Sequence, residues 1–264
     1  MPATLLTDYY SDENAWDYMS ASQFRDFVTC EAAALAKLRG EWPHPPTTAM
    51  LVGSYLHAAI EGDEAFAEFC MAHEADIHTT RGNKGKRAEF VQADAMIETL
   101  QSDLYLMSLL SGQHEVVLMT ELYGVAWKAK LDVLNEDSIV DVKTTRSLYE
   151  RYWDKAESRY VSFVEQFGYT RQLALYSELE RLTSGRETRL ATYVVAVTKE
   201  DPPDKALIEI DADRVYWELE VVKGILPRIQ SVKLGEIEPR RCERCEYCRA
   251  TKQLTGPINF MELV

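Results

Sequence analysis

The chain has 264 residues, of which 46% are hydrophobic and 27% charged, and its formal net charge is -14. This composition is typical of a globular protein and excludes a fibrous repeat or a largely disordered chain. No apolar run is long enough to cross a bilayer. Residues 1–20 are acidic and lack the pattern of a secretory signal. We therefore expect a cytoplasmic protein that does not bind membranes.

The negative charge argues against a protein that simply coats nucleic acid, because phosphate binders usually carry a basic footprint. Local charge matters more than the total, however. Basic residues gather in three segments, at 81–87, 143–159 and 240–252. Each segment alone is as consistent with solvated surface charge as with a binding site. The three together favour a basic channel on an acidic body.

Apolar residues at helical spacing dominate the first part of the chain. The helices that this spacing predicts cover residues 20–39, 48–75 and 88–111. A Pro-rich loop at 41–48 separates the first two helices, and a Gly-rich basic loop at 81–87 precedes the third.

The pattern then changes to alternating and β-branched residues, which predict strands. Three such segments, at 114–124, 126–134 and 138–144, are joined by short turns and indicate an antiparallel meander. The elements expected after it are a helix at 163–182, a strand at 189–198, a short strand at 206–210 and a helix at 212–230. This order predicts an α/β fold with a mixed sheet flanked by helices.

We expect the chain to form a single domain over residues 1–264. Within it, residues 1–112 would form a helical N-terminal part, residues 113–230 a catalytic α/β core, and residues 231–264 a Cys-rich tail.

Two Asp residues and a Lys interrupt the apolar meander. Asp132 lies near the end of the second strand, and Asp141 lies in the third strand across a short turn. Adjacent strands are about 5 Å apart, so the two carboxylates can share one hard cation. Lys143 follows Asp141 by two residues and faces the same side of the strand. An Asp-x-Lys pair alone is usually ordinary surface charge, but the upstream Asp132 weakens that interpretation.

This grouping suits the hydrolysis of a phosphate ester. Magnesium, for which manganese can substitute, accepts oxygen ligands and keeps waters. It can lower the pKa of an attacking water and stabilise charge on a phosphate, while an adjacent ammonium orients that water. The residues therefore predict a magnesium-dependent phosphodiesterase with Asp132, Asp141 and Lys143 at the reacting centre.

Four further residues are candidates for the same centre. His57 lies in a predicted helix, where a lone His is more often a packed or surface residue than a ligand. Glu121, in the first strand of the meander, is a candidate metal ligand, although a surface carboxylate is equally consistent. Gln172 and Tyr176 are one helical turn apart and so share a face, as they would in any amphipathic helix.

Taken in order, these residues resemble the PD-(D/E)xK nuclease superfamily, and within it the RecB-like and RecE-like phage exonucleases of the exonuclease VIII type. The motifs that carry the resemblance are Gly53-Ser-x-x-His57, Asp132, Asp141-Val-Lys143-Thr-Thr and Gln172-x-x-x-Tyr176. Each motif alone is weak, whereas the ordered set is specific and spans most of the chain. The resemblance implies a restriction-endonuclease-like α/β core.

The resemblance also implies roles for individual residues. Asp132 and Asp141 would hold the catalytic metal, with the Val142 carbonyl and His57 completing the site. Lys143 would assist the attacking water. The residues expected to organise the site or the DNA are Gln172, Tyr176, Arg146 and Arg151, together with Lys84, Lys86 and Arg87 of the basic loop.

Enzymes of this type digest one strand of linear double-stranded DNA from an end. The resemblance implies 5′→3′ digestion in phage-type recombination, by a protein encoded by a phage or prophage in a bacterial host. It further implies a ring-shaped homo-oligomer that passes the remaining strand to a RecT-like single-strand annealing protein. An endonuclease or repair nuclease of the same fold, and a catalytically silent DNA-binding module, are the alternatives.

Five Cys residues include the dense cluster Cys242-x-x-Cys245-x-x-Cys248. An odd number in a cytoplasmic chain argues against a disulfide framework. Cys30 is the natural fourth ligand for a metal at this cluster. Some RecB-like nucleases hold a four-iron cluster with the same arrangement of one N-terminal and three C-terminal Cys, although the last spacing here is shorter. Because four thiolates suit either metal, a [4Fe-4S] cluster, zinc and free thiols all remain open.

Overall fold

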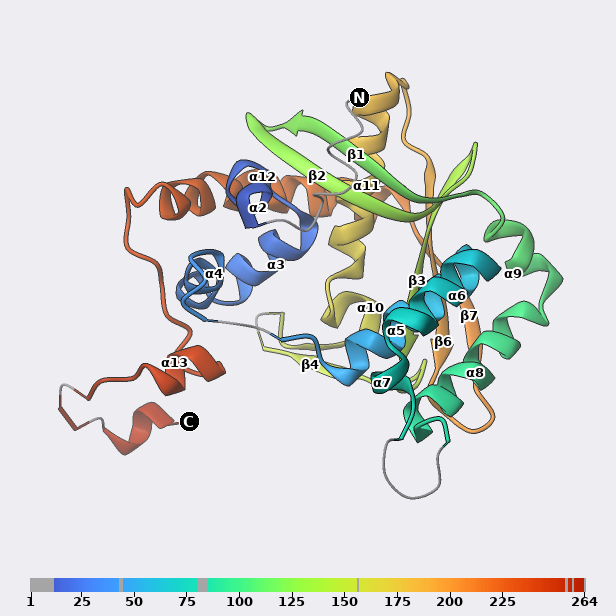
Figure 1. Cartoon of the computed structure of the whole chain (residues 1–264). Coiled ribbons are helices and arrows are strands. Elements are labelled where there is room, and N and C mark those ends of the chain that lie inside the picture. Colours follow the sequence, from blue (N-terminus) through green and yellow to red (C-terminus); the bar gives the residue numbers. More distant parts are fainter. Residues whose placement is uncertain are drawn as a thin grey trace.

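The computed structural model describes residues 12–42, 45–79, 85–155, 157–254, 256–257 and 259–263 (Figure 1). At its centre is a five-stranded sheet with the strand order β1-β2-β3-β6-β7. The strands are β1 (Gln113–Leu122), β2 (Val125–Leu134), β3 (Ser138–Thr145), β6 (Ala191–Thr198) and β7 (Lys205–Ile210). The α/β fold with a mixed sheet, predicted from the sequence, is confirmed.

The first three strands form the predicted antiparallel meander. β3 then pairs in parallel with β6 along its whole length. Parallel neighbours need a long crossover connection, and here that connection contains a helix, α11 (Tyr169–Ser184). β7 closes the sheet antiparallel to β6. β3 therefore lies in the middle of the sheet, between an antiparallel and a parallel neighbour.

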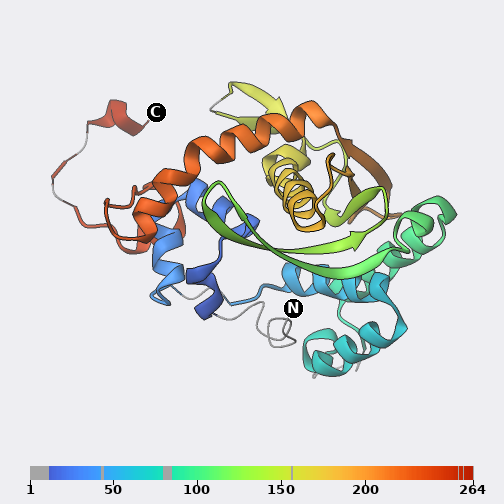
Figure 2. The ribbon, with the colours of Figure 1, turned by 90° about the horizontal axis from the view of Figure 1, so that it is seen from above.

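Helices cover both faces of the sheet (Figure 2). One face packs against α11, α12 (Ala212–Lys233) and α3 (Ala21–Thr29), with Phe24, Trp127 and Leu173 fully buried between them. The other face packs against α5 (Thr48–Glu61), α8 (Ala88–Gln101) and α9 (Leu104–Leu109). Two shorter helices, α6 (Asp63–Ala72) and α7 (Glu74–Ile77), follow α5.

Successive residues of β3 point to opposite faces, as the pleat requires. Ile139 belongs to the core beneath α11, whereas Val140 and Val142 belong to the core beneath α5 and α8. Asp141 and Lys143 therefore point to the α11 side. The sequence places two charged residues on the inner face of a buried strand, where only a functional or paired role is tolerated.

Several predicted helices are interrupted. The helix expected at 20–39 is two helices, α3 and α4 (Glu31–Leu38), because Cys30 between them is extended, with φ -163° and ψ 106°. The helix expected at 163–182 is also two, α10 (Phe163–Gln166) and α11, because Gly168 takes a left-handed φ of 71°. Similar breaks divide 48–75 into α5, α6 and α7, and 88–111 into α8 and α9.

Some short elements were not predicted. Two three-residue strands, β4 (Tyr152–Asp154) and β5 (Arg159–Val161), form a separate hairpin after β3. The remaining short helices are α2 (Asp12–Asp17), α13 (Glu246–Ala250) and the 3-10 helix η1 (Phe260–Leu263). None of the helices in the described part of the chain is long and apolar enough to span a membrane.

Candidate active site

The site forms where β2 separates from β3. The two strands pair only next to their turn, at Val133 with Val140 and at Leu134 with Ile139. Beyond that point, the backbone N–H of Val142 donates to a side chain of β2, Asp132 Oδ2, at 2.8 Å. The divergence of two paired strands thus opens a space between them and directs the Asp132 carboxylate into it.

Asp141 and Lys143 lie on the β3 side of this opening. Lys143 Nζ is 2.7 Å from Asp141 Oδ2, and the Asp141 side chain is only 1% exposed. From α11, Gln172 Nε2 donates to Asp141 Oδ1 at 3.1 Å and to the Tyr176 hydroxyl at 2.9 Å. The aromatic ring of Tyr169 lies 5.2 Å from Lys143 Nζ. The structure therefore brings together the Asp, Lys, Gln and Tyr that the sequence placed at one centre.

His57 enters the same space from α5, on the other side of the sheet. Its Nε2 is 3.0 Å from the Val142 carbonyl oxygen, and its Nδ1 is 3.5 Å from Asp132 Oδ1. The second contact orients the ring toward the carboxylate. The expected neighbours Asp132, Val142 and His57 are thus in direct contact.

The prediction of Glu121 as a metal ligand is wrong, because this residue lies away from Asp132. It pairs with Ala126 beside the β1–β2 turn, at the far end of the hairpin from Asp132. Glu115 lies opposite Asp132 instead, in the register set by His114 with Val133 and Val116 with Leu131. The ligand atoms of His57, Glu115 and Asp132 all lie within 4.8 Å of one another.

Sequence reasoning missed Glu115 because its position depends on a local backbone distortion. Glu115 has a φ of 55°, a left-handed conformation that non-Gly residues rarely adopt. The distortion falls within β1, where the sequence HEVVLMTEL contains two Glu residues and no turn signal. A rare conformation in mid-strand often accompanies a functional site, but alternation alone cannot reveal it.

The electrostatics of the two Asp residues differ. Burial raises the pKa of Asp141, and the negative charge of Asp132 adds to this; Lys143 offsets only part, so that the pKa is about 6. Burial also acts to raise the pKa of Asp132. There the charges of His57 and Lys143, with the Val142 N–H, outweigh burial and hold the pKa well below its usual range.

The two basic groups respond to the same carboxylates. Burial acts to lower the pKa of Lys143, but the negative charges of Asp141 and Asp132 outweigh it and raise the pKa. Burial likewise opposes protonation of His57, and the adjacent Asp132 carboxylate raises its pKa. Four charged groups at the site thus shift one another's pKa values, a feature that is common at active sites.

The donor set fits a hard divalent cation. It consists of carboxylate oxygens, a backbone carbonyl and one imidazole, and oxygen donors are what magnesium prefers. Asp141 Oδ2 is buried beside the Lys143 ammonium and, within the described part of the chain, accepts no well-directed hydrogen bond. Two carboxylates, Glu115 and Asp132, also face each other across the strands; Lys130 pairs with Glu115, and His57 lies 3.5 Å from Asp132. The residues that would hold the ion are Asp132, Asp141, His57, Glu115 and the Val142 carbonyl.

His57, Glu115 and Asp132 line a large cleft of about 890 Å³. Its walls come from α3, α5, α6 and α11, and Lys143 and Gln172 also lie along it. Cations within the cleft include Arg25, Lys130 and Arg171. A wide cleft with a charged floor is large enough to admit a nucleic-acid strand.

The other residues expected to contact DNA lie elsewhere. Arg146 and Arg151 follow β3 and are exposed; Arg146 pairs with Glu150 at 3.3 Å, and the Arg151 guanidinium lies 5.7 Å from the Tyr160 ring of the β4–β5 hairpin. They remain predicted DNA contacts.

The basic loop does not fit its predicted role as well. Lys86 Nζ is engaged internally, 2.6 Å from Asp94 Oδ2 and 2.8 Å from the Tyr55 hydroxyl. Arg87 donates to the carbonyl of Ala75 at 3.1 Å. Both residues therefore fasten the C-terminal end of the loop to the neighbouring helices, and Lys84 lies outside the described residues.

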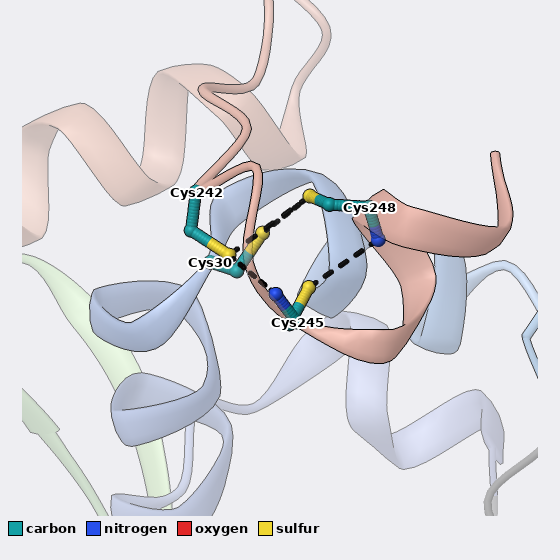
Figure 3. A group of neighbouring side chains, drawn as sticks. All are labelled: Cys30, Cys242, Cys245 and Cys248. Atoms are coloured by element: carbon teal, nitrogen blue, oxygen red, sulfur yellow. Dashed lines mark hydrogen bonds between the residues drawn. The ribbon is translucent and has the colours of Figure 1, made fainter. Parts of the chain in front are cut away.

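The four Cys residues expected to form a cluster do meet. Cys30, between α3 and α4, lies beside Cys242, Cys245 and Cys248 of the C-terminal tail, and the four sulfur atoms lie within 4.8 Å of one another (Figure 3). Cys70, by contrast, packs beside the core formed by α5 and α8.

Comparison with known proteins agrees with this geometry. Residues 20–251 match the model of a family described as a PDDEXK-like domain of unknown function (DUF3799). The crystal structure of a protein from Eubacterium rectale, provisionally described as an exonuclease, superposes with a TM-score of 0.88 at 35% sequence identity. The alignment covers 97% of this chain and 96% of that one. A comparison with curated proteins found no significant match.

Proposed function

Because the chain belongs to the PDDEXK-like family, we propose that it is a metal-dependent nuclease that digests linear double-stranded DNA from its ends. The observation that carries the proposal is the meeting of Asp132, Asp141, Lys143 and Gln172 at the point where β2 and β3 separate. The description of the Eubacterium rectale protein as an exonuclease supports end-dependent digestion.

We assign the metal site to Asp132, Asp141, the Val142 carbonyl and His57, with Glu115 as an additional ligand. Magnesium or manganese bound there would lower the pKa of the attacking water and neutralise charge on the scissile phosphate. Asp132 is suited to this role because its neighbours keep it ionised. Asp141, whose pKa is raised to about 6, would be drawn fully into its ionised form by a cation.

Lys143 would contribute in a second way. Its ammonium is fixed by Asp141 and by the Tyr169 ring, so it meets a phosphate without reorganising. A preorganised positive group of this kind stabilises the charge that develops in the transition state. Gln172 positions the Asp141 carboxylate, and Tyr176 in turn accepts the second hydrogen bond of the Gln172 amide.

The finer features of the proposal come from the resemblance to RecE-like enzymes. They are 5′→3′ polarity, a ring-shaped homo-oligomer and transfer of the remaining strand to an annealing protein in phage-type recombination. The cleft holds cations such as Arg25, Lys130 and Arg171 beside the acidic Glu61, Glu68 and Glu115, and a ring would enclose these cations although the net charge of the chain is -14. Arg146 and Arg151 would hold the strand near the end of β3.

The decisive experiment compares linear with covalently closed circular duplex DNA in magnesium. We expect digestion of the linear DNA alone, and none with a chelator or with the isosteric variant Asp141→Asn. The matched control is Glu121→Gln, which removes a carboxylate from the same sheet but away from the cleft.

Each outcome has a clear meaning. Cleavage of the closed circle would show that the enzyme is an endonuclease, and absence of metal-dependent cleavage by folded protein would favour a silent DNA-binding module. End-labelled strands, one label at each end, give the polarity from which label is released first.

A further inference from the structure

The four Cys residues lie outside the cleft, on the side of the molecule formed by α4 and α13 (Figure 1). We propose that they bind a single tetrahedral zinc ion, which fastens the C-terminal tail to the N-terminal helices. This proposal is independent of the nuclease activity.

The distances between the sulfur atoms indicate which metal centre the four Cys residues can bind. Cys248 Sγ is 3.6 Å from Cys30 Sγ and 3.9 Å from Cys242 Sγ, and all four sulfurs lie within 4.8 Å of one another. Four thiolates around one zinc at about 2.3 Å form a tetrahedron with edges of about 3.8 Å. The separations of 3.6 and 3.9 Å match these edges, and the upper bound of 4.8 Å on the others is consistent with them. They are too long for a disulfide, whose bonded sulfurs are about 2 Å apart, and the Cys residues are free.

The same distances disfavour a four-iron cluster. In such a cluster each thiolate binds a different iron at a separate corner, so the sulfur atoms surround the whole cluster and lie farther apart than around a single ion. Figure 3 shows the four Cys side chains gathered in one place, and their sulfur atoms lie within 4.8 Å of one another, a spacing that suits one ion. The Cys arrangement shared with some iron–sulfur nucleases therefore serves a smaller centre in this chain.

Two backbone N–H groups around the Cys cluster point toward sulfur atoms and would stabilise thiolates. The N–H of Cys245 donates to Cys242 Sγ at 3.3 Å, and the N–H of Cys248 donates to Cys245 Sγ at 3.4 Å. N–H groups directed at sulfur stabilise its negative charge. Basic residues at 240–252 lie in the same segment; Arg241, for example, donates to the Cys248 carbonyl at 2.9 Å and so helps to fix the backbone of this Cys.

Apart from hydrogen bonds of the Arg240 backbone to Glu31 and Ala32, few contacts in the described residues hold the tail. α13 has only five residues, too few to be stable as a helix alone. Its apolar contacts are few: Cys30, Ala32 and Cys248 form the buried part of the cluster, and the Tyr247 ring contacts Trp42 at 5.5 Å. A metal that joins residue 30 to residues 242–248 closes a loop of more than 200 residues, which lowers the entropy of the unfolded chain.

The test measures metals bound to the full chain, purified without oxygen from cells supplied with both zinc and iron. We expect one zinc per chain, little iron and no visible absorption. Cobalt added to the metal-free protein should give the intense visible bands of a tetrahedral thiolate site. Cys30→Ser and Cys245→Ser should each lose the zinc, whereas Cys70→Ser, the matched control, should retain it.

Two outcomes would overturn the proposal. About four irons per chain with a broad visible absorption would establish an iron–sulfur cluster. Four thiols that react with a thiol reagent in the wild type as fast as in unfolded protein, with no bound metal, would show free Cys residues. Because metal content is measured without DNA, a failure of the nuclease proposal would leave this result unaffected.

Discussion

Glu115 and Glu121 offer a matched pair of carboxylates on one strand. Only Glu115 lies within reach of Asp132 and His57. We predict that Glu115→Gln raises the magnesium concentration needed for half-maximal cleavage by about 10- to 100-fold, the usual effect of weakening a metal site. Glu121→Gln should leave the magnesium dependence unchanged. Equal dependence in both variants would remove Glu115 from the metal site.

Gln172 allows the positioning of Asp141 to be tested without removing a charge. Its amide joins Asp141 Oδ1 to the Tyr176 hydroxyl. Gln172→Leu should lower the maximal rate at saturating magnesium by about tenfold or more, because Asp141 loses its directed hydrogen bond. Tyr176→Phe, which leaves the bond to Asp141 in place, should have a much smaller effect. Rates measured at several magnesium concentrations would separate poor positioning from weak metal binding.

The residues that we propose as catalytic could be grouped from the sequence because their side chains interrupt an apolar pattern. Asp132, Asp141 and Lys143 interrupt apolar strands across a short turn, and Gln172 and Tyr176 share a helical face. Glu115 could not be identified, since its position depends on a positive φ within β1 that no neighbouring residue signals. The spacing of motifs therefore predicts the residues at the centre of the site, whereas the position of Glu115 depends on a backbone distortion that the sequence does not indicate.

At the scale of elements, Glu31 joins three parts of the chain. From α4, its carboxylate accepts bonds from Arg228 of α12 at 2.6 and 2.8 Å and from the N–H of Arg240 in the tail at 2.7 Å. Glu31→Gln should lower the free energy of unfolding by about 1–2 kcal/mol, a figure reduced for partial solvent exposure. Glu187→Gln, at an exposed position, is the control for loss of a surface charge.

The effect of Glu31 should depend on pH. Burial acts to raise the pKa of Glu31, but Arg228 and the Arg240 N–H outweigh it and lower the pKa. A carboxyl whose pKa is depressed in the folded state stabilises the protein above its unfolded pKa, and this contribution disappears as the pH falls through the folded value. Denaturant unfolding should therefore show a constant difference between wild type and Glu31→Gln near neutral pH, which shrinks below about pH 4.5. A difference that persists in acid would contradict the ion pair.

The order of elements could be read from the sequence, but several of their interruptions could not. Helical spacing continues through Cys30, and only the structure shows that this residue is extended between α3 and α4. Gly168 was a visible signal, yet an isolated Gly within a helical pattern is often tolerated. The β4–β5 hairpin escaped prediction because strands of three residues carry too little alternation to detect.

For the whole molecule, the active site and the Cys cluster have different relations to stability. In the cleft, His57 and Lys143 keep Asp132 ionised, whereas burial and the charge of Asp132 disfavour the ionised form of Asp141 until a cation binds. The cluster connects distant parts of the chain and, with zinc bound, adds stability. Function and folding are thus assigned to separate sites in one chain.

This separation predicts that one variant loses cleavage but keeps its Tm, whereas a second variant loses Tm but keeps cleavage. Asp141→Asn should abolish cleavage while changing the Tm in metal-free buffer little, because relief of the repulsion from Asp132 is offset by loss of the ion pair with Lys143. Cys245→Ser should lower the Tm by several degrees, at about 2–4 °C for each kcal/mol in a chain of this size. It should retain cleavage per folded molecule at low temperature, since the cluster lies outside the cleft. Thermal unfolding and cleavage rates, measured on the same preparations, would contradict this division if Cys245→Ser lost activity while its Tm stayed at the wild-type value.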